Sequence, residues 1–220
     1  MHQIHENNNK LFEKCGKICF LSVCGCPHWD GVVDKGFFMV RGAVFIICTL
    51  LLARFSWRAL GDFRAHGFYR FFAFEGIVAL LLINQPVWFK KPFSPVHLLS
   101  WLLLGLSICF IALSLKKLKE EGGHDHRGDM PGNHDFENTV NIVETGLYRL
   151  IRHPMYTSLL FLGWGAFLKR ITVLNTCLIC MVTFFLFVTA RVEEDENIRF
   201  FGTSYVDYMR RTKMFIPWIL

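Results

Sequence analysis

The residues best suited to chemistry lie in one short stretch, 145–156, which leads into an apolar segment beginning at Met155. The candidate site residues in this stretch are Gly146, Tyr148, Arg152, His153, Pro154 and Tyr156. Polar groups at the mouth of a membrane helix are costly to desolvate, so they usually serve a purpose there. Pro154 suits the first turn of a helix, and we expect His153 before it to lie outside helical geometry with its side chain free. The N–H groups of that turn and the positive end of the helix dipole predict a binding site for an anionic group.

A second polar cluster follows the last long apolar segment. Its candidate site residues are Arg191, Glu193, Glu194 and Tyr205, and the aromatic residues Phe201 and Tyr208 stand close to Tyr205 in the chain. The carboxylates of the acidic run 193–196 can hold an ammonium group. The aromatic residues recur at helical spacing, which predicts an amphipathic helix lying on the cytoplasmic membrane surface, interrupted by Gly202 and ended by Pro217.

The composition indicates a membrane protein rather than a soluble domain. Hydrophobic residues make up 53% of the 220 residues and charged residues only 19%, and the apolar residues are clustered in runs. These runs predict an all-α, polytopic membrane protein with about five transmembrane helices, at residues 36–53, 71–89, 92–115, 155–168 and 171–190. The run 155–168 is shorter than the roughly 20 residues that a span needs, so we expect protein to shield its polar start, 148–154. Only Lys169 and Arg170 separate it from the last run, which predicts a tight antiparallel hairpin.

We expect one membrane domain, 36–220, after a polar, cysteine-containing tail, 1–35. The net charge of +6 is typical of loops that face anionic lipid, and we do not interpret it as nucleic-acid binding. Most lysines and arginines lie in three regions on one side of the membrane: between the first and second runs, between the third and fourth, and after the fifth. Because basic loops stay in the cytoplasm, we expect a cytoplasmic C-terminus and an outside N-terminus.

Three sequence blocks carry a resemblance to a known family. They are Thr145-Gly146-x-Tyr148-x-x-x-Arg152-His153-Pro154-x-Tyr156, Arg191-x-Glu193-Glu194, and Phe201-Gly202-x-x-Tyr205-x-x-Tyr208. In order and spacing these blocks resemble the integral-membrane methyltransferases, which group isoprenylcysteine carboxyl methyltransferases with phospholipid N-methyltransferases and many bacterial relatives. The resemblance covers roughly residues 95–217. One departure is Ser158, where the family often has glycine.

The resemblance implies S-adenosylmethionine as methyl donor and a lipophilic, membrane-dissolved acceptor, either isoprenylcysteine carboxylate-like or phospholipid-like. It implies a cofactor region formed by residues 135–156 and 191–217 at the cytoplasmic face of a bacterial inner membrane. Arg152 and Arg191 would be catalytic, facing the reacting centre and the polar head of the acceptor. The cofactor would be bound by Gly146, Tyr148, His153, Pro154, Tyr156, Glu193, Glu194 and Tyr205. No metal is implied.

Other interpretations stay open on the residues alone. Membrane sterol and steroid reductases have a similar Arg-His-Pro-x-Tyr start and use NADPH, although they typically show Asn where this chain has Met155. A non-catalytic protein could bind metal through two groups, Cys15, Cys19, Cys24 and Cys26, or the histidine-rich stretch 124–134. Neither group has the spacing of a standard zinc site, and the cysteines suit disulfides equally well. Glu75, inside the second run, either serves a function or pairs near the membrane surface with Arg70.

Overall fold

The computed structural model describes residues 35–90, 92–123 and 139–217. Within them the regular secondary structure is helical, and the connecting segments include isolated bridge positions such as the pair Ile151 and Lys213. The helices are α2 (Lys35–Phe55), α3 (Trp57–Leu60), α4 (His66–Asn84), η1 (Gln85–Val87), α5 (Pro95–Glu121), η2 (Gly146–Arg149), α6 (Pro154–Phe167), α7 (Val173–Phe201) and α8 (Thr203–Arg211). Among them α2, α4, α5 and α7 are long and apolar enough to cross a membrane. The prediction of an all-α, polytopic membrane protein is confirmed.

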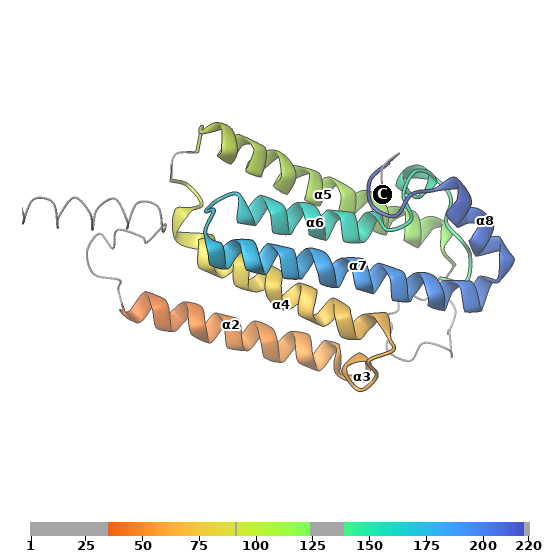
Figure 1. Cartoon of the computed structure of the whole chain (residues 1–220), viewed down its shortest axis with the longest axis horizontal. Coiled ribbons are helices and arrows are strands. Elements are labelled where there is room, and N and C mark those ends of the chain that lie inside the picture. Colours follow the sequence, from red (N-terminus) through yellow and green to blue (C-terminus); the bar gives the residue numbers. More distant parts are fainter. Residues whose placement is uncertain (1–34, 91, 124–138, 218–220) are drawn as a thin grey trace, which may run out of the picture. The chain divides into compact units, whose positions relative to one another are not determined.

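The chain divides into two compact units, Met1–Val40 and Arg41–Leu220. Of the first unit the structure describes only residues 35–40, which begin α2. In the second unit α4, α5, α6 and α7 run side by side, and α6 contacts each of the other three (Figure 1). This bundle carries the residues that the sequence singled out.

Helix α6 has only 14 residues, as the short apolar run predicted. The chain before it is covered by protein, since Tyr148, Ile151 and His153 are all buried. A short helix can therefore serve at membrane depth, because its irregular start lies within protein and not in lipid.

Helix α7 continues well beyond the predicted span, 171–190, and holds the acidic run inside the same helix. Glutamate favours helix, and the helix ends at Gly202, whose φ of +64° is rarely adopted by residues with a side chain. The amphipathic helix expected after this break is α8. Its tyrosines, Tyr205 and Tyr208, are buried in the protein.

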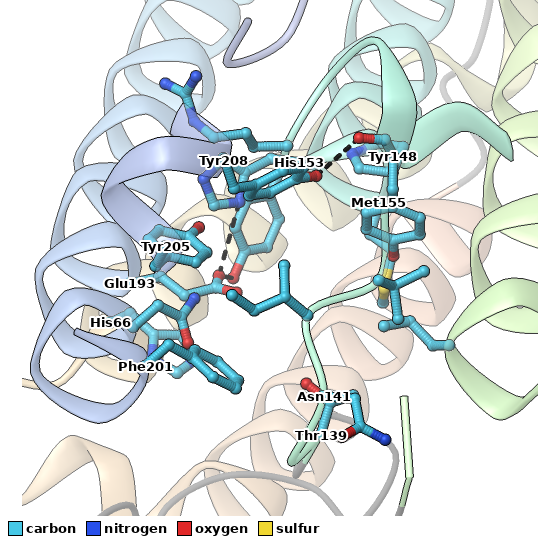
Figure 2. Close-up of a pocket in the computed structure, with 17 residues that line it drawn as sticks. His66, Thr139, Asn141, Tyr148, His153, Met155, Glu193, Phe201, Tyr205 and Tyr208 are labelled. Carbon is cyan, nitrogen blue, oxygen red and sulfur yellow. Dashed lines mark hydrogen bonds and ion pairs between the residues drawn. The ribbon is translucent and has the colours of Figure 1, made fainter. Parts of the chain in front are cut away.

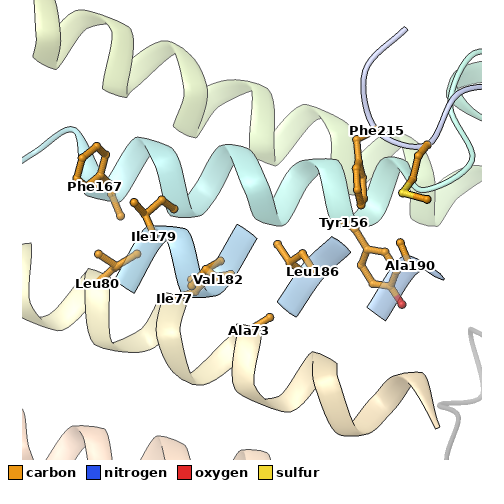
Figure 3. Close-up of a cluster of buried hydrophobic side chains, with 12 residues drawn as sticks. Ala73, Ile77, Leu80, Tyr156, Phe167, Ile179, Val182, Leu186, Ala190 and Phe215 are labelled. Carbon is orange, nitrogen blue, oxygen red and sulfur yellow. The ribbon is translucent and has the colours of Figure 1, made fainter. Parts of the chain in front are cut away.

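The core lies where α4, α6 and α7 meet (Figure 3). Its fully or nearly buried apolar residues are Ala73, Ile77, Leu80, Tyr156, Ala166, Phe167, Ile179, Val182, Leu186, Ala190, Met214 and Phe215. Met214 and Phe215 come from the chain after α8, so the C-terminal segment closes one end of this core. The two helices that carry the polar clusters, α6 and α7, thus pack against each other through this core.

Polar side chains fix the opposite end of the bundle, where residues 168–172 join α6 to α7. Asn175 donates to Asn84 Oδ1 at 2.7 Å and to the carbonyl of Arg170 at 2.7 Å, while Asn84 donates to the carbonyl of Ala166 at 3.0 Å. Lys169 is buried with its Nζ 3.3 Å from the ring centroid of Trp101, and burial lowers the pKa of its ammonium. These contacts hold the short connection between the two helices in place.

Glu75 lies within α4, and its Oε2 accepts a hydrogen bond from Thr49 of α2 at 2.8 Å. Its Oε1 has no hydrogen-bond partner among the described residues. The hydrogen bond from Thr49 therefore offsets part of the free-energy cost of burying the Glu75 carboxyl group within an apolar helix.

Close approach of α5 and α6 at Gly165 gives a test of this packing. A Cβ at Gly165 would lie 2.9 Å from Leu104 Cγ and 3.2 Å from the carbonyl oxygen of Ser100, whereas a Cβ at Gly105 would have nothing within 4 Å. We expect Gly165→Ala to lower the free energy of unfolding by about 1–3 kcal/mol through overpacking. Gly105→Ala should leave it unchanged or raise it by up to about 1 kcal/mol, because alanine favours helix. Thermal unfolding of the two variants in detergent makes the comparison, and equal midpoints would contradict it.

Candidate active site

A pocket of about 810 Å³, counting the part open to solvent, lies where α4 begins and where α7 and α8 meet (Figure 2). Its lining residues are His66, Leu118, Thr139, Asn141, Ile142, Val143, Tyr148, Arg152, His153, Pro154, Met155, Tyr156, Glu193, Asn197, Phe201, Tyr205 and Tyr208. Its lining combines aromatic side chains with a few placed polar groups, as the lining of small-molecule and cofactor sites does. Both polar clusters of the sequence thus meet at one pocket.

The main chain before α6 is held in place by the segment after α8. The N–H of Arg152 donates to the carbonyl of Lys213 at 2.7 Å, and the N–H of His153 donates to that of Met214 at 3.1 Å. Lys213 returns a bond to the carbonyl of Leu150 at 3.1 Å. Pro154 then starts α6 at a position where no N–H is needed. The extended C-terminal segment therefore fixes the direction in which the side chains of residues 152–156 leave the backbone.

Arg152 and Glu194 form a buried ion pair between this stretch and α7. Arg152 Nε donates to Glu194 Oε1 at 2.6 Å, and the Arg152 Nη1 donates to the carbonyls of Met209 (3.2 Å) and Thr212 (2.5 Å). The side chain of Glu194 is 2% exposed and that of Arg152 10%. Arg191 reaches the other oxygen of Glu194 at 3.5 Å, but its own side chain is 60% exposed. Arg152 therefore joins α6, α7 and the end of α8 through one guanidinium.

Next to this pair, His153 and Tyr156 face Glu193. The Tyr156 hydroxyl donates to Glu193 Oε2 at 2.5 Å, and His153 Nδ1 lies 3.9 Å from the same oxygen. The two rings are stacked with centroids 5.4 Å apart, and His153 Nε2 lies 3.4 Å from Glu194 Oε1. Glu193 and the stacked rings of His153 and Tyr156 thus form a pocket wall that carries a negative charge and is partly covered by aromatic rings. Such a wall suits a cationic ligand.

Three buried tyrosines form much of the remaining surface. The Tyr208 hydroxyl donates to the carbonyl of Tyr148 at 2.7 Å, and Tyr205 stacks on Phe201. Burial raises the pKa of Tyr148, Tyr205 and Tyr208 well above the ordinary value of a phenol, and the nearby charge of Glu193 adds to the rise for Tyr148 and Tyr205. The three phenols are therefore neutral at physiological pH, and none can act as a phenolate base.

The structure adds His66 and Glu196, which the sequence did not single out. His66 begins α4 and lines the pocket, with its Nδ1 2.5 Å from Glu196 Oε2 on α7. The signal in the sequence was weak. Glu196 lies in the acidic run, one helical turn after Glu193, but nothing near His66 in the chain indicated a site.

The predicted site residues divide into two groups by position. Those that line the pocket are Tyr148, Arg152, His153, Pro154, Tyr156, Glu193 and Tyr205. Those that do not are Gly146, Arg191 and Glu194. Gly146 has a φ of +59° at the start of η2, beside the side chain of Lys117, and Glu194 lies behind the wall, bound to Arg152.

Within residues 35–90, 92–123 and 139–217 no group of three or more metal-ligating side chains is present. The cysteines Cys15, Cys19, Cys24 and Cys26 and the histidine-rich stretch 124–134 lie outside the described residues.

Comparison with known proteins supports a methyltransferase. Residues 96–204 match the family model described as phospholipid methyltransferase. Methanethiol S-methyltransferase 1 of Bradyrhizobium diazoefficiens is 33% identical over 72 residues, which are 33% of this chain and 25% of the relative. Methanethiol S-methyltransferase of Pseudomonas deceptionensis is 28% identical over 71 residues, 32% of this chain and 26% of the relative. The resemblance to the integral-membrane methyltransferases is confirmed.

The similarity to the methyltransferases has clear limits along the chain. The aligned part spans about a quarter of the length of the two curated relatives. The stretch matched to the family model holds η2, the start of α6 and the acidic part of α7, whereas His66, Tyr205 and Tyr208 lie outside it. Part of the pocket wall therefore comes from outside the methyltransferase match.

The buried ion pair predicts a large, localised effect on stability. Glu194→Ala leaves the Arg152 guanidinium without its carboxylate, and we expect it to lower the free energy of unfolding by roughly 3–5 kcal/mol. Asp195→Ala, which removes an exposed carboxylate from the next position, should change it by no more than about 0.5 kcal/mol. Thermal unfolding in detergent measures both. Similar losses for the two variants would show that the ion pair does not hold this end together.

Proposed function

We propose that the protein is an enzyme that transfers a methyl group from S-adenosylmethionine to a lipophilic acceptor taken from the membrane. The observation that carries the proposal is the convergence of His153, Tyr156 and Glu193 on one pocket at the end of apolar, membrane-length helices. The match of residues 96–204 to phospholipid methyltransferases supports the same chemistry.

The pocket residues fit the chemical groups of this cofactor. Its ammonium needs a carboxylate, and Glu193 supplies one beside neutral phenols. Its carboxylate suits the positive end of α6, where Pro154 and Met155 line the pocket. When bound, the cofactor would supply an activated methyl group on a cationic sulfur, for which the faces of Tyr156 and Tyr205 are suitable neighbours.

Of the three predicted residues that do not line the pocket, we assign Gly146 and Glu194 indirect roles in cofactor binding. Glu194 would act through Arg152, holding its guanidinium and the start of α6 in position. Gly146 would act through the turn that begins η2 and places Tyr148 in the pocket. In both cases the side chain that contacts the cofactor would belong to another residue, Arg152 for Glu194 and Tyr148 for Gly146.

The acceptor would approach from the lipid side of α7. A second hollow there is lined by Arg152, Phe187, Arg191, Met209, Thr212, Lys213 and Met214. It combines three cations with apolar side chains, and Arg152 belongs to both hollows. We therefore propose that Arg152 and Arg191 face the polar head of the acceptor while its apolar part stays in the bilayer. Holding donor and acceptor in line in this way can supply roughly 7–11 kcal/mol of the barrier lowering.

We also propose that the pocket faces the cytoplasm of a bacterial cell and that residues 36–220 form the functional domain. The excess of basic residues in loops on the pocket side supports this orientation. S-adenosylmethionine is made in the cytoplasm, so the donor would reach the pocket directly.

The test is transfer of label from radiolabelled S-adenosylmethionine to lipids or small molecules in membranes that contain the protein. We expect label in an extractable lipophilic product, and its absence would contradict the proposed function.

Glu193→Gln keeps an oxygen for the Tyr156 hydroxyl but removes the charge, so we expect S-adenosylhomocysteine to bind about tenfold more weakly, a loss near 1.4 kcal/mol. Asp195→Asn, an exposed change on the same helix, should bind as the wild type does. Isothermal titration of both variants measures the difference.

A further inference from the structure

We propose that His66 is the general base of the reaction, oriented by Glu196, and that the acceptor is therefore a group that must lose a proton before methylation. A thiol or an amine meets this condition. A carboxylate does not, because it is already ionised at neutral pH. The inference rests on the proposed methyl transfer and concerns a residue outside the stretch matched to the family model.

One carboxylate fixes the His66 ring. Glu196 Oε2 lies 2.5 Å from His66 Nδ1, and Glu196 Oε1 accepts the main-chain N–H of His66 at 3.1 Å. Because a carboxylate accepts but does not donate, the proton of the neutral imidazole lies on Nδ1 and Nε2 carries the lone pair. A histidine whose second nitrogen is held by a carboxylate is the usual arrangement for a general base.

His66 is placed to meet an acceptor in the pocket. It is 3% exposed and lines the pocket beside Glu193, on the wall formed by α4 and α7 (Figure 2). The charged groups that act on it are Glu193 and Glu196 from α7 and Arg70 from its own helix. Arg58 of α3, the short helix that packs on α4, is exposed. Two carboxylates against one guanidinium favour the imidazolium that forms when His66 takes a proton.

The other polar groups of the pocket are less suited to this task. His153 Nδ1 lies 3.9 Å from Glu193, and its Nε2, 3.4 Å from Glu194, has no hydrogen-bond partner among the described residues, so no carboxylate at hydrogen-bond distance orients this ring. Glu193 accepts the Tyr156 hydroxyl, and burial raises the pKa of the other tyrosines. His66 Nδ1 is held by a carboxylate at hydrogen-bond distance, and in the neutral ring this gives Nε2 the lone pair that accepts a proton.

In the proposed methyl transfer each bond that forms is matched by a bond that breaks. His66 Nε2 takes the proton of the acceptor's S–H or N–H bond, and the electron pair left on that atom forms the new bond to the methyl carbon. The old carbon–sulfur bond breaks with its electrons staying on sulfur, which becomes a neutral thioether. His66 is then an imidazolium held by Glu196, and it returns the proton to water at the pocket mouth.

The experiment uses the full-length protein in membranes with radiolabelled S-adenosylmethionine and three acceptors, a long-chain alkanethiol, phosphatidylethanolamine vesicles and a long-chain fatty acid. We expect the thiol or the amine to be methylated and the fatty acid not. His66→Asn can still donate to Glu196 but cannot take a proton, so its rate at neutral pH should fall by about 10²–10⁴. His97→Asn, which changes a histidine at the start of α5, is the matched control and should keep the wild-type rate.

A pH profile separates a base from a structural residue. If His66 removes the proton, the deficit of His66→Asn shrinks about tenfold per pH unit as hydroxide or self-ionisation of the acceptor takes over, while S-adenosylhomocysteine binds as in the wild type. An equal deficit at every pH, no deficit, or lost cofactor binding would overturn the role of His66. Methylation of the fatty acid alone would overturn the acceptor class. Transfer to none of the acceptors or membrane components would instead contradict the proposed function itself.

Discussion

The buried ion pair between Arg152 and Glu194 is the constraint on which the pocket end of the structure depends. Two charges taken out of water are tolerated only when each is matched and the remaining donors are satisfied. Glu194 supplies the match, and the carbonyls of Met209 and Thr212 take further donors of the guanidinium. Because these partners come from α7, from the last turn of α8 and from the residue that follows α8, the pair brings the stretch before α6, helix α7 and the end of α8 to one place. The residues of these segments that line the pocket are therefore held in place by the ion pair.

A second constraint is the membrane itself. Non-helical backbone has no hydrogen-bond partners in lipid, so it must be covered by protein. The chain before α6 meets this condition by pairing with residues 213 and 214, and the buried side chains of Met214 and Phe215 complete the cover. The C-terminal segment therefore makes an irregular, functional stretch possible beside the apolar helices.

The two ends of the bundle are built for different tasks. At one end Asn84 and Asn175 bond to each other and to main-chain carbonyls, which fixes a short connection. At the other end Glu193 of α7 accepts a hydrogen bond from Tyr156 and lines the pocket. The rigid end holds α6 and α7 in register, so that His153 lies 3.9 Å from Glu193 at the pocket wall.

The sequence by itself determined the fold class, the approximate spans and the two polar clusters, because apolar runs and proline and glycine positions act locally along the chain. It also indicated that residues 152–156 and 193–194 belong together, through their resemblance to a family. It did not show that the last apolar run and the acidic run form one continuous helix, α7, because no local signal before Gly202 ends that helix. Only the tertiary structure decided that Glu194 faces Arg152 and that Arg191 stays largely exposed, as neighbouring positions on a helix point in different directions. It alone brought His66 against Glu196, 130 residues away in the chain, because such contacts depend on how α4 and α7 pack.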